Sequence, residues 1–318
     1  MSCFVYATDA HARASTPSGR IDDYPTAILD KLQQVGTLAE EKDALCVVFG
    51  GDLFHEPDPS TSIKNQVLSL LMKYPCPVYG VWGSHDVFGY NQNTLGRTAL
   101  GTLAAAGAIR ILYPQKALRA GPFDIVGLSH SYDIDDPAKH CYDLSRLEIE
   151  GTRPKSILVE VAHGMLLDKP FAVGDAGYTL LKDVHTEAHY LLSGHFHPGY
   201  PVTTIGRTTF CNPGSLGRLE NTEGNRSRPV QVAVVDEEGI EMVSLRYRAA
   251  EEVFSGRIIK DNNSRGLDAF VKQLHQQVGA IDTQDTKDLV LRVAKERKAS
   301  KEVCSELIDI VERAQQEA

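Results

Sequence analysis

Residues 45–55 read Leu-Cys-Val-Val-Phe-Gly-Gly-Asp-Leu-Phe-His, an apolar run followed at once by two glycines, an aspartate and a histidine. The β-branched and aromatic residues of the run predict a buried strand at 45–49. The glycines permit a tight turn directly after it. Asp52 and His55 are therefore expected in a loop at the carboxyl end of this strand.

The same arrangement of an apolar strand followed by polar residues recurs along the chain. It places Asp9 and His11 after a strand at 3–8, Ser84, His85 and Asp86 after 78–82, His163 after 157–162, and His195 and His197 after 190–193. Further strands are predicted at 123–128, 208–211, 230–235 and 240–247, and helices at 24–41, 63–73 and 94–106. This alternation predicts an α/β fold of two mixed sheets packed face to face with helices outside. Loops at the carboxyl ends of strands converge in such folds, so the five polar clusters are expected to meet.

Carboxylates and imidazoles are the ligands of manganese, iron, zinc or cobalt rather than of a metal that prefers thiolates. In Asp9-x-His11 both side chains point to one face of an extended segment, so they can hold one ion. His195-x-His197 has the same spacing and can offer one ring to each of two ions. Asp52, with two carboxylate oxygens, can bridge them. Each motif alone is weak, but packing does not explain all five at strand ends in one chain.

Composition limits the other possibilities. The chain has 318 residues, 42% of them hydrophobic and 24% charged, which is ordinary for a globular protein with a sizeable core. Six scattered cysteines without C-x-x-C spacing predict reduced thiols and no cysteine zinc site. The N-terminus lacks the basic segment of a signal peptide, and we expect no membrane association and a cytoplasmic location. A net charge of −9 does not attract nucleic acid through its overall field.

The order D-x-H, G-D-x-x-H, G-x-H-D, H and G-H-x-H resembles the calcineurin-like metallophosphoesterase superfamily. His55, three residues after Asp52, the Asn-Pro-Gly-Ser turn at 212–215 and a small terminal domain resemble its SbcD-type DNA repair nucleases. The motif resemblance covers residues 1–248. It implies two divalent metal ions, manganese first, with magnesium, iron, zinc and cobalt as alternatives.

Carried over to this sequence, the resemblance implies a division of labour among the motif residues. Asp9, His11 and His197 would hold the first ion, His163 and His195 the second with residue 84, and Asp52 would bridge. His85, oriented by Asp86, would stabilise or protonate the leaving oxygen, and His55 would contact the phosphate. A supporting role without proton transfer stays open for both histidines.

Residue 84 departs from the family pattern, which has an asparagine whose amide oxygen binds the second ion. Ser84 has only a short neutral hydroxyl, expected to reach an ion through water. The second site is then weak, selective for one metal, or lost in a protein that serves as a scaffold. We favour a functional but weakened site, because the other ligands and both histidines are retained.

After residue 247 the sequence becomes polar and has no clear period. We therefore predict a boundary there between a nuclease domain at 1–248 and a capping domain at 249–318. The second segment reads as a βαβα unit with strands at 257–260 and 288–293 and helices at 266–278 and 301–315. Relatives usually continue into a segment that docks an ATPase, whereas this sequence stops at Ala318. The small domain holds such a partner, the chain is shortened, or no such partner exists.

Three functions therefore compete. The leading hypothesis is an SbcD-like DNA exo/endonuclease subunit, a homodimer by resemblance, acting with an SMC-like ATPase of the SbcC type. The alternatives are a stand-alone phosphodiesterase or phosphatase on small nucleotides, and a scaffold with an impaired second site.

The remaining histidines, at positions 130, 140, 185, 189 and 275, lack partners at ligand spacing and are predicted to be structural. Arg218 is predicted at the surface and Trp82 in the core.

Overall fold

The structure is a computed structural model that describes residues 2–170 and 177–256. Within these ranges the strands form two six-stranded sheets and one small pair. The first sheet has the order β14-β13-β1-β2-β3-β4, with bounds β1 (Cys3–Ala7), β2 (Val47–Phe49), β3 (Val78–Gly80), β4 (Arg110–Ile111), β13 (Gln231–Asp236) and β14 (Ile240–Ser244). Its strands β1 to β4 are parallel, and β13 and β14 are added antiparallel.

The second sheet is also mixed. Its order is β11-β12-β10-β7-β6-β5, with bounds β5 (Leu118–Ala120), β6 (Phe123–Leu128), β7 (Ile157–His163), β10 (Tyr190–Gly194), β11 (Tyr200–Ile205) and β12 (Thr208–Asn212). Strands β6, β7, β10 and β12 run parallel, and the two outer strands are antiparallel. Two residues each from β8 (Leu166–Leu167) and β9 (Thr179–Leu180) form the third, smaller sheet. The predicted fold of two mixed sheets is confirmed.

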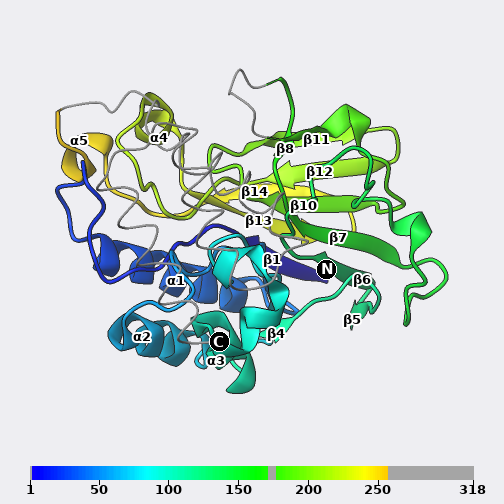
Figure 1. Cartoon of the computed structure of the whole chain (residues 1–318), viewed down its shortest axis with the longest axis horizontal. Helices are drawn as coiled ribbons and strands as arrows, with labels where there is room; N and C mark the ends of the chain where they lie inside the picture. The colour runs from blue at the N-terminus through cyan, green and yellow to red at the C-terminus, as the bar shows by residue number, and fades with distance from the viewer. Residues whose placement is uncertain (1, 171–176, 257–318) are drawn as a thin grey trace, which may run out of the picture. The chain divides into compact units, whose positions relative to one another are not determined.

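The side chains of β1 point alternately into the core between the two sheets and into the core under the helices. Phe4 and Tyr6 point into the core between the sheets, where Phe4 meets Phe123 edge-on with ring centroids 5.1 Å apart. Val5 and Ala7 point the other way, into the core under the helices. Successive strand residues face opposite sides, so this strand is buried on both. Figure 1 shows β1 between α1 (Tyr24–Glu41) and the green strands of the second sheet.

Helices cover the outer face of the first sheet. Helix α1 begins after Asp23, whose side chain accepts a hydrogen bond from the Thr26 amide, and has Pro25 in its first turn. It buries Ile28, Leu32 and Val35. Beside it lie α2 (Thr61–Leu71) and α3 (Ala99–Ala105), which follow β2 and the short 3-10 turn η2 (Gln92–Arg97). The remaining short helices are α4 (Glu223–Ser227), α5 (Ala250–Val253), η1 (Phe88–Tyr90), η3 (Leu144–Arg146) and η4 (Leu181–Asp183).

The helix predicted at 24–41 and the strand predicted at 123–128 coincide with α1 and β6. Strands β4, β5, β8, β9 and β11 were not predicted, because four of them have two or three residues and β11 contains Pro201. A proline is tolerated there because β11 is an edge strand. Within the described ranges, no helix combines the length and apolar character that crossing a bilayer requires.

The region around the predicted boundary continues the packing of the first 248 residues. Val253 and Phe254 are buried, and the amide of Ile21 donates to the carbonyl of Val253 at 2.9 Å. The strands and helices predicted from residue 257 onward, and with them the capping domain as a unit, lie outside the described residues, and so does His275.

Because Phe4 is fully buried where the two sheets meet, its removal leaves a cavity in the core. We expect Phe4→Ala to lower the free energy of unfolding by about 3–5 kcal/mol. Chemical denaturation followed by circular dichroism measures this. Ile205→Ala, at a side chain 38% exposed on the edge strand, is the control and should change stability by no more than about 0.5 kcal/mol. Equal losses for the two variants would contradict the assigned core.

Candidate metal centre

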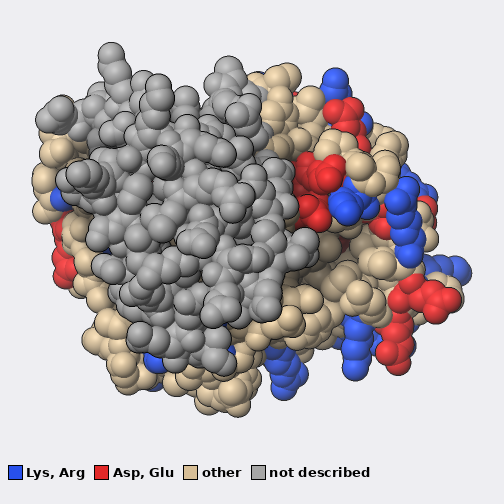
Figure 2. All heavy atoms as spheres, in the orientation of Figure 1, with Lys and Arg blue, Asp and Glu red and all other residues tan. Residues whose placement is uncertain are grey.

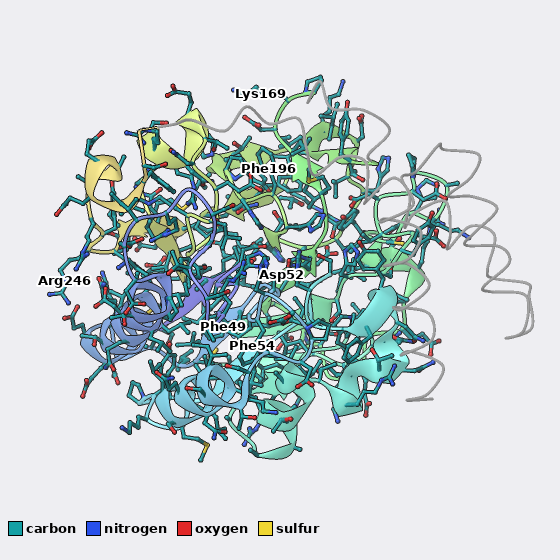
Figure 3. The ribbon with its side chains drawn as sticks, turned by 60° about the vertical axis from the view of Figure 1, so that its left-hand side comes forward. Phe49, Asp52, Phe54, Lys169, Phe196 and Arg246 are labelled. Carbon is teal, nitrogen blue, oxygen red and sulfur yellow. The ribbon has the colours of Figure 1, made fainter. Side chains whose placement is uncertain are left out.

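Asp52 lies in the loop that follows β2, in the middle of the described residues in Figure 3. Its Oδ1 accepts a hydrogen bond from the backbone amide of His85 at 2.8 Å. Its Oδ2 lies 3.6 Å from Nε2 of His11 and 3.3 Å from Nε2 of His163. These two histidines come from different sheets, so Asp52 lies between them and could hold an ion together with either one.

The first candidate position contains one ligand atom each from Asp9, His11, Asp52 and His197, all within 4.8 Å of one another. The Nε2 atoms of His11 and His197 are only 2.9 Å apart. Two lone pairs at this distance repel unless a proton or a cation lies between them. Two nitrogens bound to one ion at about 2.1 Å and at right angles would be about 3.0 Å apart. The observed spacing therefore fits a shared metal ion.

The second candidate position contains ligand atoms of Asp52, His163 and His195, again within 4.8 Å of one another. Nδ1 of His163 donates to the carbonyl of Gly50 at 2.7 Å, which leaves Nε2 as the nitrogen that faces the site. That Nε2 is buried and has no hydrogen-bond partner among the described residues. A ring held by a carbonyl on one nitrogen and free on the other is the usual arrangement of a metal-ligating histidine.

Burial keeps most of these rings neutral. It lowers the pKa of His11 and His195 well below the ordinary value and that of His197 to about 3, with neighbouring histidines adding to the effect at His11 and His195. A neutral ring has a lone pair to offer, so all three are ready to bind a metal at pH 7.

Asp52 and His163 instead form a charged pair in the metal-free protein. Burial alone would raise the pKa of Asp52, but the positive charge of the neighbouring His163 outweighs it and holds that pKa well below its usual range. Burial likewise opposes the charge on His163, but Asp52 raises its pKa to about 10. A metal ion at the second position must therefore displace a proton from His163.

Asp9 is held from two sides. Its carboxylate accepts hydrogen bonds from the hydroxyl of Thr8 at 2.6 Å and from the backbone amide of His195 at 3.0 Å. Burial nevertheless raises its pKa to about 6. Among the described residues only histidines make ion-pair contacts with this buried carboxylate, which favours a bound cation.

The backbone at the site is strained. Four of the predicted ligands have left-handed backbone, with φ of 52° at Asp9, 47° at His11, 49° at Asp52 and 75° at His195. Residues other than glycine rarely adopt this region, and each such position costs on the order of 1–3 kcal/mol. This strain gathers at the strand ends where the ligand side chains converge, as expected of a functional site.

Two glycines make room for the ligands. A Cβ at Gly51, where φ is 96°, would collide with the ring of His163, and one at Gly83 would collide with the carboxylate of Asp52. Alanine at either position would displace a ligand, whatever its effect on an approaching phosphate.

His85 and His55 lie next to the first position. Their rings stack with centroids 5.3 Å apart, and the His85 ring meets that of His11 edge-on at 4.8 Å. His85 Nδ1 lies 2.8 Å from the carbonyl of His55, so it carries a proton and leaves Nε2 free. Burial lowers the pKa of His55 to about 4, and Arg13 adds to this effect.

The predicted orientation of His85 by Asp86 is wrong. The carboxylate of Asp86 accepts backbone amides instead, from Gly83 at 2.9 Å, Phe54 at 3.2 Å and Leu53 at 3.4 Å. Asp86 thus fastens the loop after β3 to the loop after β2, and the carbonyl of His55 orients His85. Burial and the charge of Asp52 raise the pKa of Asp86 to about 6.

Ser84 is half-buried, and its hydroxyl lies 3.4 Å from Oδ2 of Asp52. Residue 84 therefore offers no amide oxygen to the second position, and its hydroxyl contacts Asp52. The expected weakness of that position stays a prediction.

Sequence reasoning missed His130, which was expected to lack partners. Its ring centroid lies 5.3 Å from that of His195 and 5.8 Å from that of His163. The signal was present in the sequence, because His130 follows the strand β6 as the other polar clusters follow theirs. Arg13, two residues beyond His11, was also missed although its charge acts on His55.

Two other predictions concern residues away from the ligands. Arg218 is 4% exposed and not a surface residue, because its guanidinium stacks between the rings of Tyr247 and Phe254 and donates to the carbonyl of Arg248. Trp82 is buried, as predicted. The described cysteines Cys3, Cys46, Cys76, Cys141 and Cys211 are all free thiols.

Nitrogen and oxygen donors at the ends of strands in two packed mixed sheets define the class of metal-dependent phosphoester hydrolases. The sequence profile of the calcineurin-like phosphoesterases matches residues 4–199, and the chain belongs to this family. The orphaned Nε2 of His163 and the close nitrogens of His11 and His197 fit the two-metal centre that the family implies.

The solved structures to which the chain is similar share little sequence with it. A dimetal phosphatase from Danio rerio is 14% identical, with a TM-score of 0.48, covering 80% of this chain and 98% of that one. A protein from Thermus thermophilus is 12% identical, with a TM-score of 0.45 and coverages of 77% and 99%. An archaeal phosphodiesterase is 11% identical, with a TM-score of 0.38 and coverages of 76% and 99%. A search of curated proteins finds no match.

If the second position lacks a ligand because residue 84 is a serine, an asparagine at residue 84 should raise the affinity of that position for a metal ion. We expect Ser84→Asn to bind the second Mn²⁺ about 10-fold more tightly while the first affinity stays the same, since one direct ligand is added. Calorimetric titration of the metal-free proteins measures both affinities. Equal affinity for the second ion in the original chain and in Ser84→Asn would contradict a weakening of the second position by Ser84.

Metal binding at the second position should depend on pH through His163. The free protein holds a proton on this ring up to a pKa of about 10, and the ion binds only the unprotonated ring. We therefore expect the second affinity to rise about tenfold per pH unit between about pH 7 and pH 9, with release of about one proton. Titration at pH 7 in two buffers of different ionisation enthalpy counts that proton. Binding without proton release would show that His163 is already neutral.

Proposed function

We propose that this chain is an SbcD-like nuclease subunit that hydrolyses phosphodiester bonds in DNA with manganese ions. An SMC-like ATPase partner, a homodimer and a cytoplasmic location are parts of the same proposal. The observation that carries it is the stacked pair His55 and His85, which is not part of the two ligand sets that share Asp52. One ring nitrogen each of His11, His55 and His85 lies within 4.8 Å of the others.

The two histidines of this pair suit different tasks. His85 is exposed, and its Nδ1 proton is engaged by the carbonyl of His55, so Nε2 is available to an incoming substrate. Protonation of Nε2 lets His85 donate a proton to the leaving alkoxide, which is a poor leaving group without one. His55 has a pKa of about 4 and stays neutral at pH 7. It can donate a hydrogen bond to a phosphate oxygen without giving up its proton.

Arg13 supports a phosphodiester substrate. Its guanidinium donates to the hydroxyl of Ser15, at 2.9 and 3.1 Å, and among the described residues no carboxylate forms an ion pair with it. A guanidinium that is not neutralised, close to His55, can bind a phosphate of the substrate. The metal ions, when bound, supply an activated water and neutralise the phosphate oxygens.

Surface charge favours recognition at the site over a broad basic surface. On the face drawn in Figure 2, the lysines and arginines of the described residues lie among aspartates and glutamates. With a net charge of −9, local groups such as Arg13 and the metal ions must hold the backbone of DNA. The same acidity favours the second candidate function, a phosphodiesterase or phosphatase for small nucleotides. Ser84 favours the third, a scaffold with an impaired second position.

The role of His85 predicts a dependence on the leaving group. We expect the protein to degrade linear duplex or single-stranded DNA in Mn²⁺ buffer and to lose activity on chelation. His85→Ala should lower kcat on DNA by about 10²–10⁴-fold. The same variant should lose far less on bis-p-nitrophenyl phosphate, because nitrophenolate leaves without a proton. Rates on both substrates and on cyclic nucleotides measure this, with the exposed His185→Ala as the control.

Other outcomes favour the alternatives. Turnover of cyclic nucleotides with intact DNA would replace the nuclease by a small-substrate enzyme. No metal-dependent turnover until residue 84 is changed to asparagine would support the scaffold. An equal loss on both substrates in His85→Ala would contradict proton donation by this ring.

A further inference from the structure

His130 is held beside the loop that carries Ser84. It follows β6, which pairs in parallel with β7 so that Leu128 lies opposite Ala162, next to His163. The amide of His130 donates to the carbonyl of Trp82 at 3.0 Å, and the indole of Trp82 donates to the carbonyl of His130 at 3.1 Å. Trp82 precedes Ser84 by two residues, so the two loops are fastened together.

The ring of His130 faces both histidines of the second metal position. It is tilted by 32° against the ring of His195, at 5.3 Å, and meets the ring of His163 edge-on at 5.8 Å. Its Nδ1 lies 3.3 Å from the carbonyl of His163, which can only accept, so Nδ1 carries the proton. Nε2 then has a free lone pair.

A ring nitrogen whose partner donates to a backbone carbonyl is the arrangement that orients histidines toward metals and their bound waters. His163 has the same arrangement toward the carbonyl of Gly50.

The second position has a gap for such a group. Its ligand atoms come from Asp52, His163 and His195, whereas a metal ion with nitrogen and oxygen ligands takes four or more. Ser84 is too short to fill the gap, and its hydroxyl lies 3.4 Å from Asp52. The ring nitrogens of His130 are not among the ligand atoms that lie within 4.8 Å of one another, so a direct bond is not the simplest connection.

We propose that His130 completes the second metal position of this chain, by accepting at Nε2 a hydrogen bond from a water molecule that takes the coordination place left by Ser84. The proposal rests on the two-metal site behind the proposed function but not on the identity of the substrate. His130 is in this sense a positioning residue, which acts on the ion through water. Packing offers a rival explanation, because Tyr90 meets the His130 ring edge-on at 5.2 Å.

The two explanations differ in whether His130 depends on residue 84. If His130 holds a water in the place of the missing amide, an asparagine at residue 84 displaces that water and makes His130 dispensable for metal binding. If His130 only supports the loops, its loss weakens the site whatever residue stands at position 84. A double-mutant cycle therefore separates them.

The test is Mn²⁺ titration of the metal-free full chain without substrate, by calorimetry and by electron paramagnetic resonance of the coupled manganese pair. We expect His130→Ala to weaken the second ion about 10–100-fold and to leave the first unchanged, which is the usual effect of losing an indirect ligand partner. In Ser84→Asn protein, the same change should leave both affinities as they were. His185→Ala, which removes an exposed histidine elsewhere, is the matched control.

The proposal is overturned if His130→Ala binds the second ion as tightly as the original chain. It is also overturned if the loss is equally large in Ser84→Asn protein. Circular dichroism confirms folding, and His130→Gln, whose amide oxygen also accepts a hydrogen bond, should retain part of the affinity if alanine disturbs the loop. The titrations use no substrate, so the expected pattern in a protein that leaves DNA intact would refute the nuclease and not this proposal.

Discussion

The structure depends on two carboxylates buried where no lysine or arginine of the described residues neutralises them. Asp9 and Asp52 are 0% and 1% exposed, and every ion-pair contact that the described residues make with them comes from a histidine. Burying an ionised group without an oppositely charged partner costs roughly several kcal/mol of desolvation free energy, even after the surrounding protein relaxes. In the metal-free chain, protonated His163 offsets part of this cost. A divalent cation offsets it far better, and the neutral rings of His11 and His197 are placed to receive one.

This constraint accounts for the unusual backbone around the site. Side chains from separate strands reach one point only because four ligand residues adopt left-handed backbone and Gly51 and Gly83 leave space for their neighbours. Such conformations persist only where the surrounding structure holds them. Here the frame is the pair of sheets, with Phe4 and Phe123 packed between them and the carboxylate of Asp86 fastening two of the loops.

Much of the fold could be predicted because its central elements have strong local patterns. Helix α1 has a capping aspartate, an early proline and apolar residues at helical spacing, and β6 and β7 have long apolar runs. Pairs such as β8 and β9 could not be predicted, since two residues have no period and their pairing depends on distant packing. The polar segment 221–229 has no helical pattern in its sequence, but it includes α4 and the buried Asn221.

For the candidate site, the sequence alone determined the donor types, their order and their places after strands, and so the chemistry of a metal-dependent hydrolase. Only the tertiary structure decided which atoms meet. The carbonyl of Gly50 sets the free nitrogen of His163 across 113 residues of sequence, and the carbonyl of His55 does the same for His85. His130 joins the second position because β6 lies beside β7, and Asp86 turns away from His85 toward backbone amides. Such contacts depend on orientation between distant segments, which residue type and spacing do not specify.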